Sequence, residues 1–149
     1  MRILIRIILL SLLVSTSVGA AFADKPGKHP RYLHSLTDLR HARALLNHLA
    51  ATEKRDEMED HAIRKIDDAI NEMKRAAIDD GKNLENHPPI DAHLTRGGRY
   101  VKVLELLDSA HRDASAEEDN PQAQGLQGRI IAHIDEAHRI VEKLQARYR

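Results

Sequence analysis

The sequence predicts an all-α protein, a four-helix up-down bundle built from two duplicated helical hairpins. Apolar residues recur every three or four positions in four segments after residue 30, which is the period of a helix with one buried face. Residues 63–73 return as residues 131–141, each one 68 positions further along, and the same offset relates residues 31–42 to residues 99–110. Repeated units of this kind usually cannot bury their apolar faces alone, so we expect the two hairpins to share one core.

Residues 1–23 have the features of a secretory signal peptide. Arg2 and Arg6 precede a short apolar run, and Ala21-Phe22-Ala23 forms a cleavage site of the A-x-A type. The apolar run is well short of the ~20 residues that span a bilayer. We therefore expect cleavage after Ala23, no stable membrane insertion afterwards, and a periplasmic or secreted chain with a flexible leader at residues 24–29.

A single domain is expected over residues 30–149, and its first hairpin occupies about residues 30–80. The first helix is predicted for residues 30–51, because Pro30 suits a first helical turn and an apolar stripe begins at Tyr32. A charged link precedes a second helix whose apolar face starts at Ile63. Gly81 supplies its stop, because glycine readily adopts the left-handed conformation at a helix C-terminus.

A connector is predicted for residues 81–98, because it contains Pro88-Pro89 and Gly97-Gly98. The second hairpin then occupies about residues 99–148. Its first helix carries an apolar stripe from Tyr100 and ends before the acidic turn at residues 117–121. The last helix is predicted for residues 122–148.

The composition excludes several classes of function. The chain has equal numbers of acidic and basic residues, and loss of the signal peptide leaves a slight acidic excess, whereas a nucleic-acid-binding surface needs a basic one. The absence of cysteine excludes disulfides, thiolate metal sites and thiol nucleophiles. No Walker loop, G-x-S-x-G or E-x-x-H motif occurs. We therefore expect no enzymatic activity.

A histidine stripe suggests metal binding. His34, His41 and His48 are spaced by seven residues in the first predicted helix, and Asp38 lies between the first two. Histidines seven apart are separated by ~10 Å along a helix, too far to bind one ion directly, whereas Asp38 can share an ion with either neighbour. These four residues are the candidate site for a divalent metal, Cu(II), Ni(II) or Zn(II). The alternative is a solvated polar helix face.

His111 differs from the stripe, because its helical position places it near the apolar face of the third helix. A histidine there is expected to lie at the core and to bond a carboxylate or a carbonyl. Two functions are consistent with these patterns. One is a metal-binding module, and the other is a structural or protein-interaction module of the cell envelope, with a protein partner or as a homodimer.

The segments KIDDAINEMKRA (residues 65–76) and HIDEAHRIVEKL (residues 133–144), with the histidine spacing of the first helix, carry a family resemblance. The chain resembles the exported, histidine-rich small metal-binding proteins of bacteria. That resemblance implies a four-helix bundle that binds copper and other divalent ions without catalysis. The connector DDGKNLENHPPID departs from the pattern, and a different exported bacterial family is the alternative.

Overall fold

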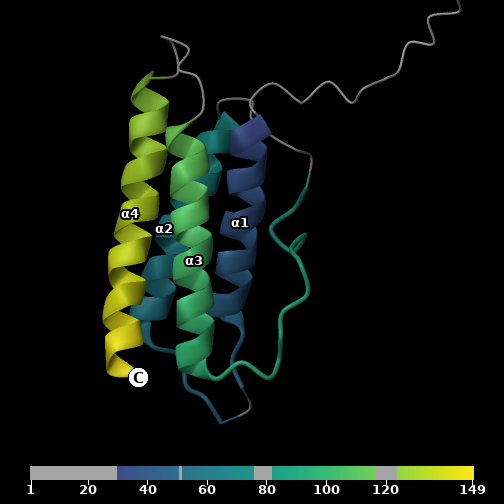
Figure 1. The fold of residues 1–149 in the computed structure, drawn as a ribbon, viewed down its shortest axis with the longest axis vertical. Coiled ribbons are helices and arrows are strands. Elements are labelled where there is room, and N and C mark those ends of the chain that lie inside the picture. Colours follow the sequence, from purple (N-terminus) through teal and green to yellow (C-terminus); the bar gives the residue numbers. More distant parts are fainter. Residues whose placement is uncertain (1–29, 51, 76–81, 117–123) are drawn as a thin grey trace, which may run out of the picture.

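The computed structural model describes residues 30–50, 52–75, 82–116 and 124–149, and these residues form a four-helix bundle (Figure 1). The helices are α1 (Pro30–Asn47), α2 (Glu57–Arg75), α3 (Arg96–Ser115) and α4 (Gln124–Arg147). No strand occurs in the described part of the chain. The predicted all-α four-helix bundle is confirmed.

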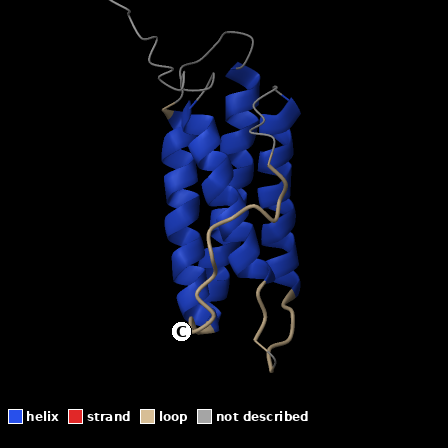
Figure 2. Cartoon of the chain, turned by 90° about the vertical axis from the view of Figure 1, so that its right-hand side faces the viewer, coloured by secondary structure: helices blue, strands red, loops and turns tan. Residues whose placement is uncertain are grey.

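Each helix packs against two others. α1 and α4 each contact both α2 and α3. The two pairs that do not contact each other, α1 with α4 and α2 with α3, lie on the two diagonals of the bundle. Contacting helices run antiparallel, since α1 and α4 point one way and α2 and α3 the other (Figure 1). The chain therefore crosses the diagonal between α2 and α3, which are parallel, so the helices do not alternate in direction as the predicted up-down order requires. Residues 82–95, called the connector below, run back along the length of the bundle (Figures 1 and 2).

The two copies of the repeat face each other. α1 packs on its counterpart α3, and α2 packs on its counterpart α4, in opposite directions. Equivalent positions are buried in both copies: Tyr32 and Tyr100 are each buried, as are Ile66 and Ile134. This is the arrangement that a two-fold rotation about an axis perpendicular to the helices produces.

The core is aliphatic and contains many alanines. Six alanines are fully buried, and they allow close approach of the helix backbones: Ala42, Ala62, Ala69, Ala110, Ala114 and Ala137. The large apolar side chains of the core are mainly leucines and isoleucines, together with the two tyrosines at equivalent positions of the repeat. Full burial of one such leucine or isoleucine contributes ~1.5–3 kcal/mol, so the shared core supplies most of the stabilisation.

Several predicted boundaries differ from the structure. α1 ends at Asn47 rather than at residue 51. α3 begins at Arg96, because the Thr95 side chain caps the helix by accepting a hydrogen bond of 3.1 Å from the Gly98 N–H. The two glycines at 97 and 98 therefore lie in the first turn of α3, not in the connector. A Cβ at Gly97 would lie 2.9 Å from the Tyr148 carbonyl oxygen, so glycine permits a close approach there.

Some predictions fall outside the described residues. These are the signal peptide (1–23), the leader (24–29), the glycine stop at residue 81 and the acidic turn (117–121). None of the helices that the structure describes has both the length and the apolarity needed to cross a membrane.

A buried ionic network joins the start of α2 to the start of α3. Glu59 is only 1% exposed and accepts hydrogen bonds from Arg96 Nη2 at 2.7 Å and from the Tyr100 hydroxyl at 2.7 Å. The Arg96 guanidinium also lies 4.4 Å from the centre of the Tyr148 ring, at the end of α4. Burial and the hydrogen bond to Glu59 raise the pKa of Tyr100. This end of the bundle is therefore held together by polar as well as apolar contacts.

Candidate metal site

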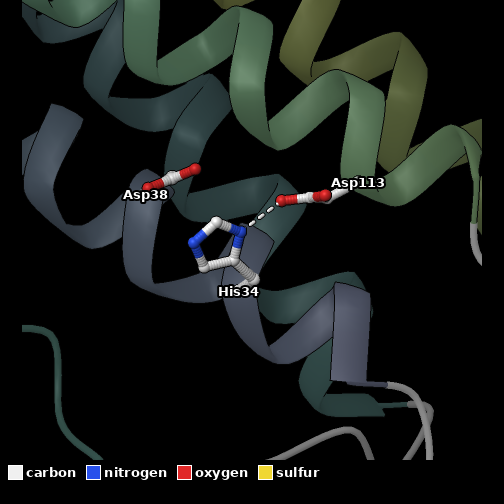
Figure 3. Close-up of side chains that lie close together, drawn as sticks. All are labelled: His34, Asp38 and Asp113. Atoms are coloured by element: carbon white, nitrogen blue, oxygen red, sulfur yellow. Dashed lines mark hydrogen bonds and ion pairs between the residues drawn. The ribbon is translucent and has the colours of Figure 1, made fainter.

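At the opposite end of the bundle, three potential metal ligands converge. His34 and Asp38 lie one turn apart on α1, and Asp113 lies in the last turn of α3. Because the two helices are antiparallel, the beginning of α1 faces the end of α3. One ligand atom from each residue lies within 4.8 Å of the other two. Figure 3 shows His34 and Asp38 projecting from α1 toward Asp113 on α3.

His34 is paired directly with Asp113. Its Nδ1 donates to Asp113 Oδ2 at 2.5 Å, and the His34 side chain is 65% exposed whereas that of Asp113 is 26% exposed. The pKa of His34 is raised, chiefly by this hydrogen bond and further by the negative charges of Asp38 and Asp113, against a smaller opposing effect of burial. The imidazole therefore holds a proton that a metal ion would have to displace.

Asp38 presents an unsatisfied oxygen. Its Oδ2 is shielded from solvent and has no hydrogen-bond partner in the described part of the chain. A shielded carboxylate oxygen without a partner is unfavourable, because the group has lost water without gaining a donor. A cation bound between Asp38 and its two neighbours would compensate that loss.

The register of α1 against α3 is fixed beside these residues. The hydroxyl of Ser35, which is fully buried, donates to the Ala110 carbonyl at 3.1 Å. Ser35 is adjacent to His34, and Ala110 is three residues before Asp113. The contact therefore sets the height at which the imidazole meets the carboxylate.

The structure brings together only two of the four predicted ligands. His34 and Asp38 are brought together, but His41 and His48 do not join them, and Asp113 takes their place. The His41 ring lies parallel to that of His87 in the connector instead. His48 follows the end of α1 and lines a groove with Asn47 and other residues. Sequence reasoning missed Asp113 because no spacing within one helix indicates the register between α1 and α3.

His111 lies elsewhere than expected. Its side chain is 41% exposed rather than at the core, and it lines a groove of ≈ 290 Å³ between α3 and α4 together with Asp135 and five other residues. It does meet a carboxylate, with its Nε2 3.4 Å from Asp135 Oδ1 on α4. The prediction of a core position was wrong, and an interhelical ion pair replaces it.

Comparison of the chain with protein-family models, with curated proteins and with solved structures found no significant match. The functional argument therefore rests on the residues themselves. One imidazole and two carboxylates on two helices could supply three ligands to a metal ion and leave its further coordination positions to water. This set combines a nitrogen ligand typical of Zn(II), Cu(II) and Ni(II) with oxygen ligands.

Proposed function

We propose that the protein is a non-enzymatic, exported protein that binds a divalent metal ion through His34, Asp38 and Asp113. The observation that carries the proposal is the convergence of three ligand atoms from two helices within 4.8 Å of one another. Ligands around one zinc ion stand ~2.0–2.2 Å from it, hence roughly 3–3.5 Å apart. Side-chain rotations that move the ligand atoms by about 1 Å would bring all three within bonding distance of one ion. Export is supported by the signal-peptide features of residues 1–23.

Zn(II) fits this ligand set best among the three metals considered. It accepts mixed nitrogen and oxygen ligands in a tetrahedral arrangement and tolerates a water in the fourth position. Cu(II) and Ni(II) remain competitors, since affinity for a nitrogen and oxygen site generally rises toward copper. The exposure of His34 supports binding rather than catalysis, because an open surface site does not enclose a substrate.

The alternative of a protein-interaction module has less support. Among the described residues, the exposed large hydrophobic side chains are Val101, at 43% exposure, and Tyr148, at 37%. They lie near the start of α3 and just after α4, and Tyr148 is already occupied by its contacts with Arg96 and Tyr100. Two such residues, one of them already in contact with Arg96 and Tyr100, do not amount to the large contiguous apolar patch that marks a docking surface.

Calorimetric titration of the metal-stripped protein with Zn(II) tests the proposal. The informative variant is Asp113→Asn, which keeps the shape and removes one ligand charge. The matched control is Glu105→Gln, because Glu105 is an exposed carboxylate on the same helix that pairs only with Lys102 in the described structure. We expect Asp113→Asn to weaken binding at least ~10-fold, as the loss of even a supporting residue does, and Glu105→Gln to leave it unchanged.

The pH dependence provides a second test. Because the pKa of His34 is raised, the proton competes with the metal, so the affinity should fall as the solution is acidified from about pH 7.5 to about pH 5.5. Equal affinities of Asp113→Asn and Glu105→Gln for Zn(II), with both variants folded by circular dichroism, would refute the site.

A further inference from the structure

A short motif occurs twice, once on each side of the groove between α3 and α4. Asp108 and His111 are the ends of the sequence D-S-A-H in α3, and Asp135 and His138 are the ends of D-E-A-H in α4. Residues three apart on a helix are neighbours on one face. Each helix therefore supplies one carboxylate and one imidazole to the same groove, and all four residues line it.

Each imidazole of the groove meets the carboxylate of the opposite helix. His111 Nε2 lies 3.4 Å from Asp135 Oδ1, and His138 Nε2 lies 3.2 Å from Asp108 Oδ1. Because α3 and α4 are antiparallel (Figure 1), the order of carboxylate and imidazole is reversed on the facing helix, and both contacts form together. The four side chains thus form a closed ring, in which each has one neighbour on its own helix and one on the other.

The second nitrogen of each imidazole has a partner on its own helix. His138 Nδ1 lies 3.6 Å from Glu142 Oε2, and His111 Nδ1 lies 3.4 Å from the Ser115 hydroxyl oxygen. In the tautomer with the hydrogen on Nδ1, these oxygens face the N–H, and the lone pair of the neutral ring is on Nε2. An oxygen partner behind the ring is the usual support of a metal-binding histidine, and here Nε2 is the nitrogen that faces the other helix.

The spacing of the four side chains suits the ligands of one ion. Two ligands bound at ~2.0–2.2 Å to a tetrahedral zinc ion stand roughly 3–3.5 Å apart, and the two contacts between the helices lie at 3.4 and 3.2 Å. Along each helix, three residues correspond to a rise of ~4.5 Å. The carboxylates close that remaining distance by rotation, because Asp135 and Asp108 are 47% and 58% exposed and are not held by packing.

The groove also has the room and the charge that a cation needs. Its volume is ≈ 290 Å³, and the remaining lining residues are Leu107, Ile134 and Arg139. The two apolar side chains are buried, so they close the groove on the side of the core. The positive charge of Arg139 is offset, because its guanidinium pairs with Glu136 on the same helix. The two carboxylates of the ring therefore leave the groove negative when both imidazoles are neutral.

We propose that one Zn(II) ion binds at a second site, independent of the one at His34, whose four ligands are Asp108, His111, Asp135 and His138. Two imidazoles and two carboxylates supply the four ligands of a closed tetrahedral site, whereas the site at His34 supplies three. The ion joins α3 to α4, and it replaces two separate ion pairs by one shared centre. Its binding stabilises the folded chain, because the unfolded chain does not hold the four side chains together.

Calorimetric titration of the metal-stripped protein with Zn(II) tests the second site. His111→Ala and His138→Ala each remove one ligand. The matched control is His133→Ala, because His133 Nδ1 lies 3.8 Å from Asp68 Oδ2 in a histidine–aspartate contact between α4 and α2, outside the groove. We expect His111→Ala and His138→Ala each to lose one equivalent of zinc, and His133→Ala to bind as many equivalents as the wild type.

The two metal proposals fail separately in this experiment. Loss of one equivalent in His111→Ala that Asp113→Asn retains supports the second site, whether or not the site at His34 binds zinc. Equal zinc binding by His111→Ala and His133→Ala overturns the second site and leaves two ordinary ion pairs. Loss in only one of His111→Ala and His138→Ala overturns the sharing of one ion. All three variants should retain the wild-type circular dichroism, because none of the substituted rings is buried.

Discussion

Replacement of Glu59 by alanine should destabilise the protein more than any other single substitution of a charged residue in α2. Glu59 is 1% exposed and accepts hydrogen bonds from Arg96 at 2.7 and 3.2 Å and from Tyr100 at 2.7 Å. Its Oε2 also accepts from the Asp56 N–H at 2.9 Å, as in a capping box. Alanine leaves the Arg96 side chain, which is 13% exposed, without its counter-charge.

The magnitude follows from the burial of this pair. Removal of one partner of a buried ion pair typically costs ~3–5 kcal/mol, because the other charge remains desolvated. The free energy of unfolding of a domain is only ~5–15 kcal/mol. Glu59→Ala should therefore remove a fifth or more of it and lower the melting temperature by roughly 10–20 °C. Glu59→Gln, which retains the volume and an acceptor oxygen, should fall between Glu59→Ala and the wild type.

Urea unfolding followed by circular dichroism at the helical minimum measures these differences. Glu57→Ala is the matched control, because Glu57 is an exposed glutamate in the same first turn of α2 and should change the free energy of unfolding by less than ~0.5 kcal/mol. A Glu59→Ala variant within about 1 kcal/mol of Glu57→Ala would show that the network does not stabilise this end of the bundle.

Four further substitutions test three separate features of the structure. Gly128→Ala should stabilise the protein by ~0.5–1 kcal/mol in thermal unfolding, because a Cβ there meets no atom within 4 Å. Gly97→Ala should destabilise it, because its Cβ would lie 2.9 Å from the Tyr148 carbonyl oxygen. A Gly97→Ala variant that is more stable than Gly128→Ala would contradict the packing. His34→Gln should cost less than ~1 kcal/mol, as for exposed ion pairs. Since the folded pKa of His34 is raised, the cost should be full below pH 6.5 and vanish as the pH rises through the raised value, so a cost that grows with pH would contradict the ion pair. Arg40→Met removes the hydrogen bond of 3.0 Å from Arg40 Nε to the Asn86 carbonyl, so it should release the connector and speed its amide hydrogen exchange while exchange in α4 stays unchanged.

The fold was predictable because it depends on patterns within the chain. The offset of 68 identified Tyr32 with Tyr100 and Ile66 with Ile134, and all four are buried in one core. The start of α3 was misplaced, since a glycine pair suggests a loop. The Thr95 cap, together with the close approach of Tyr148 to Gly97, makes the pair helical. Local propensity was overridden by a tertiary contact.

The candidate site was only half predictable for a different reason. His34 and Asp38 share one helix, so their spacing brings them together in any fold that keeps α1. Asp113 is 79 residues from His34, and its place depends on which helices are neighbours and at what register. The partner of His41 comes from the connector, whose path follows from Arg40 and not from any periodic pattern. Contacts between distant segments carry no signature in a single sequence.

The two ends of the bundle are related by the repeat, yet they now carry different kinds of side chain. A duplicated hairpin begins with two identical ends, yet the positions equivalent to His34, Asp38 and Asp113 are now Lys102, Leu106 and Leu45. Both leucines are buried, and the ionic network of Glu59 closes that end. One end of the molecule is thus held together by buried apolar and ionic contacts, whereas the other carries exposed polar side chains. Substitutions among the polar side chains of the exposed end should therefore change its charge and polarity while the free energy of unfolding stays nearly constant.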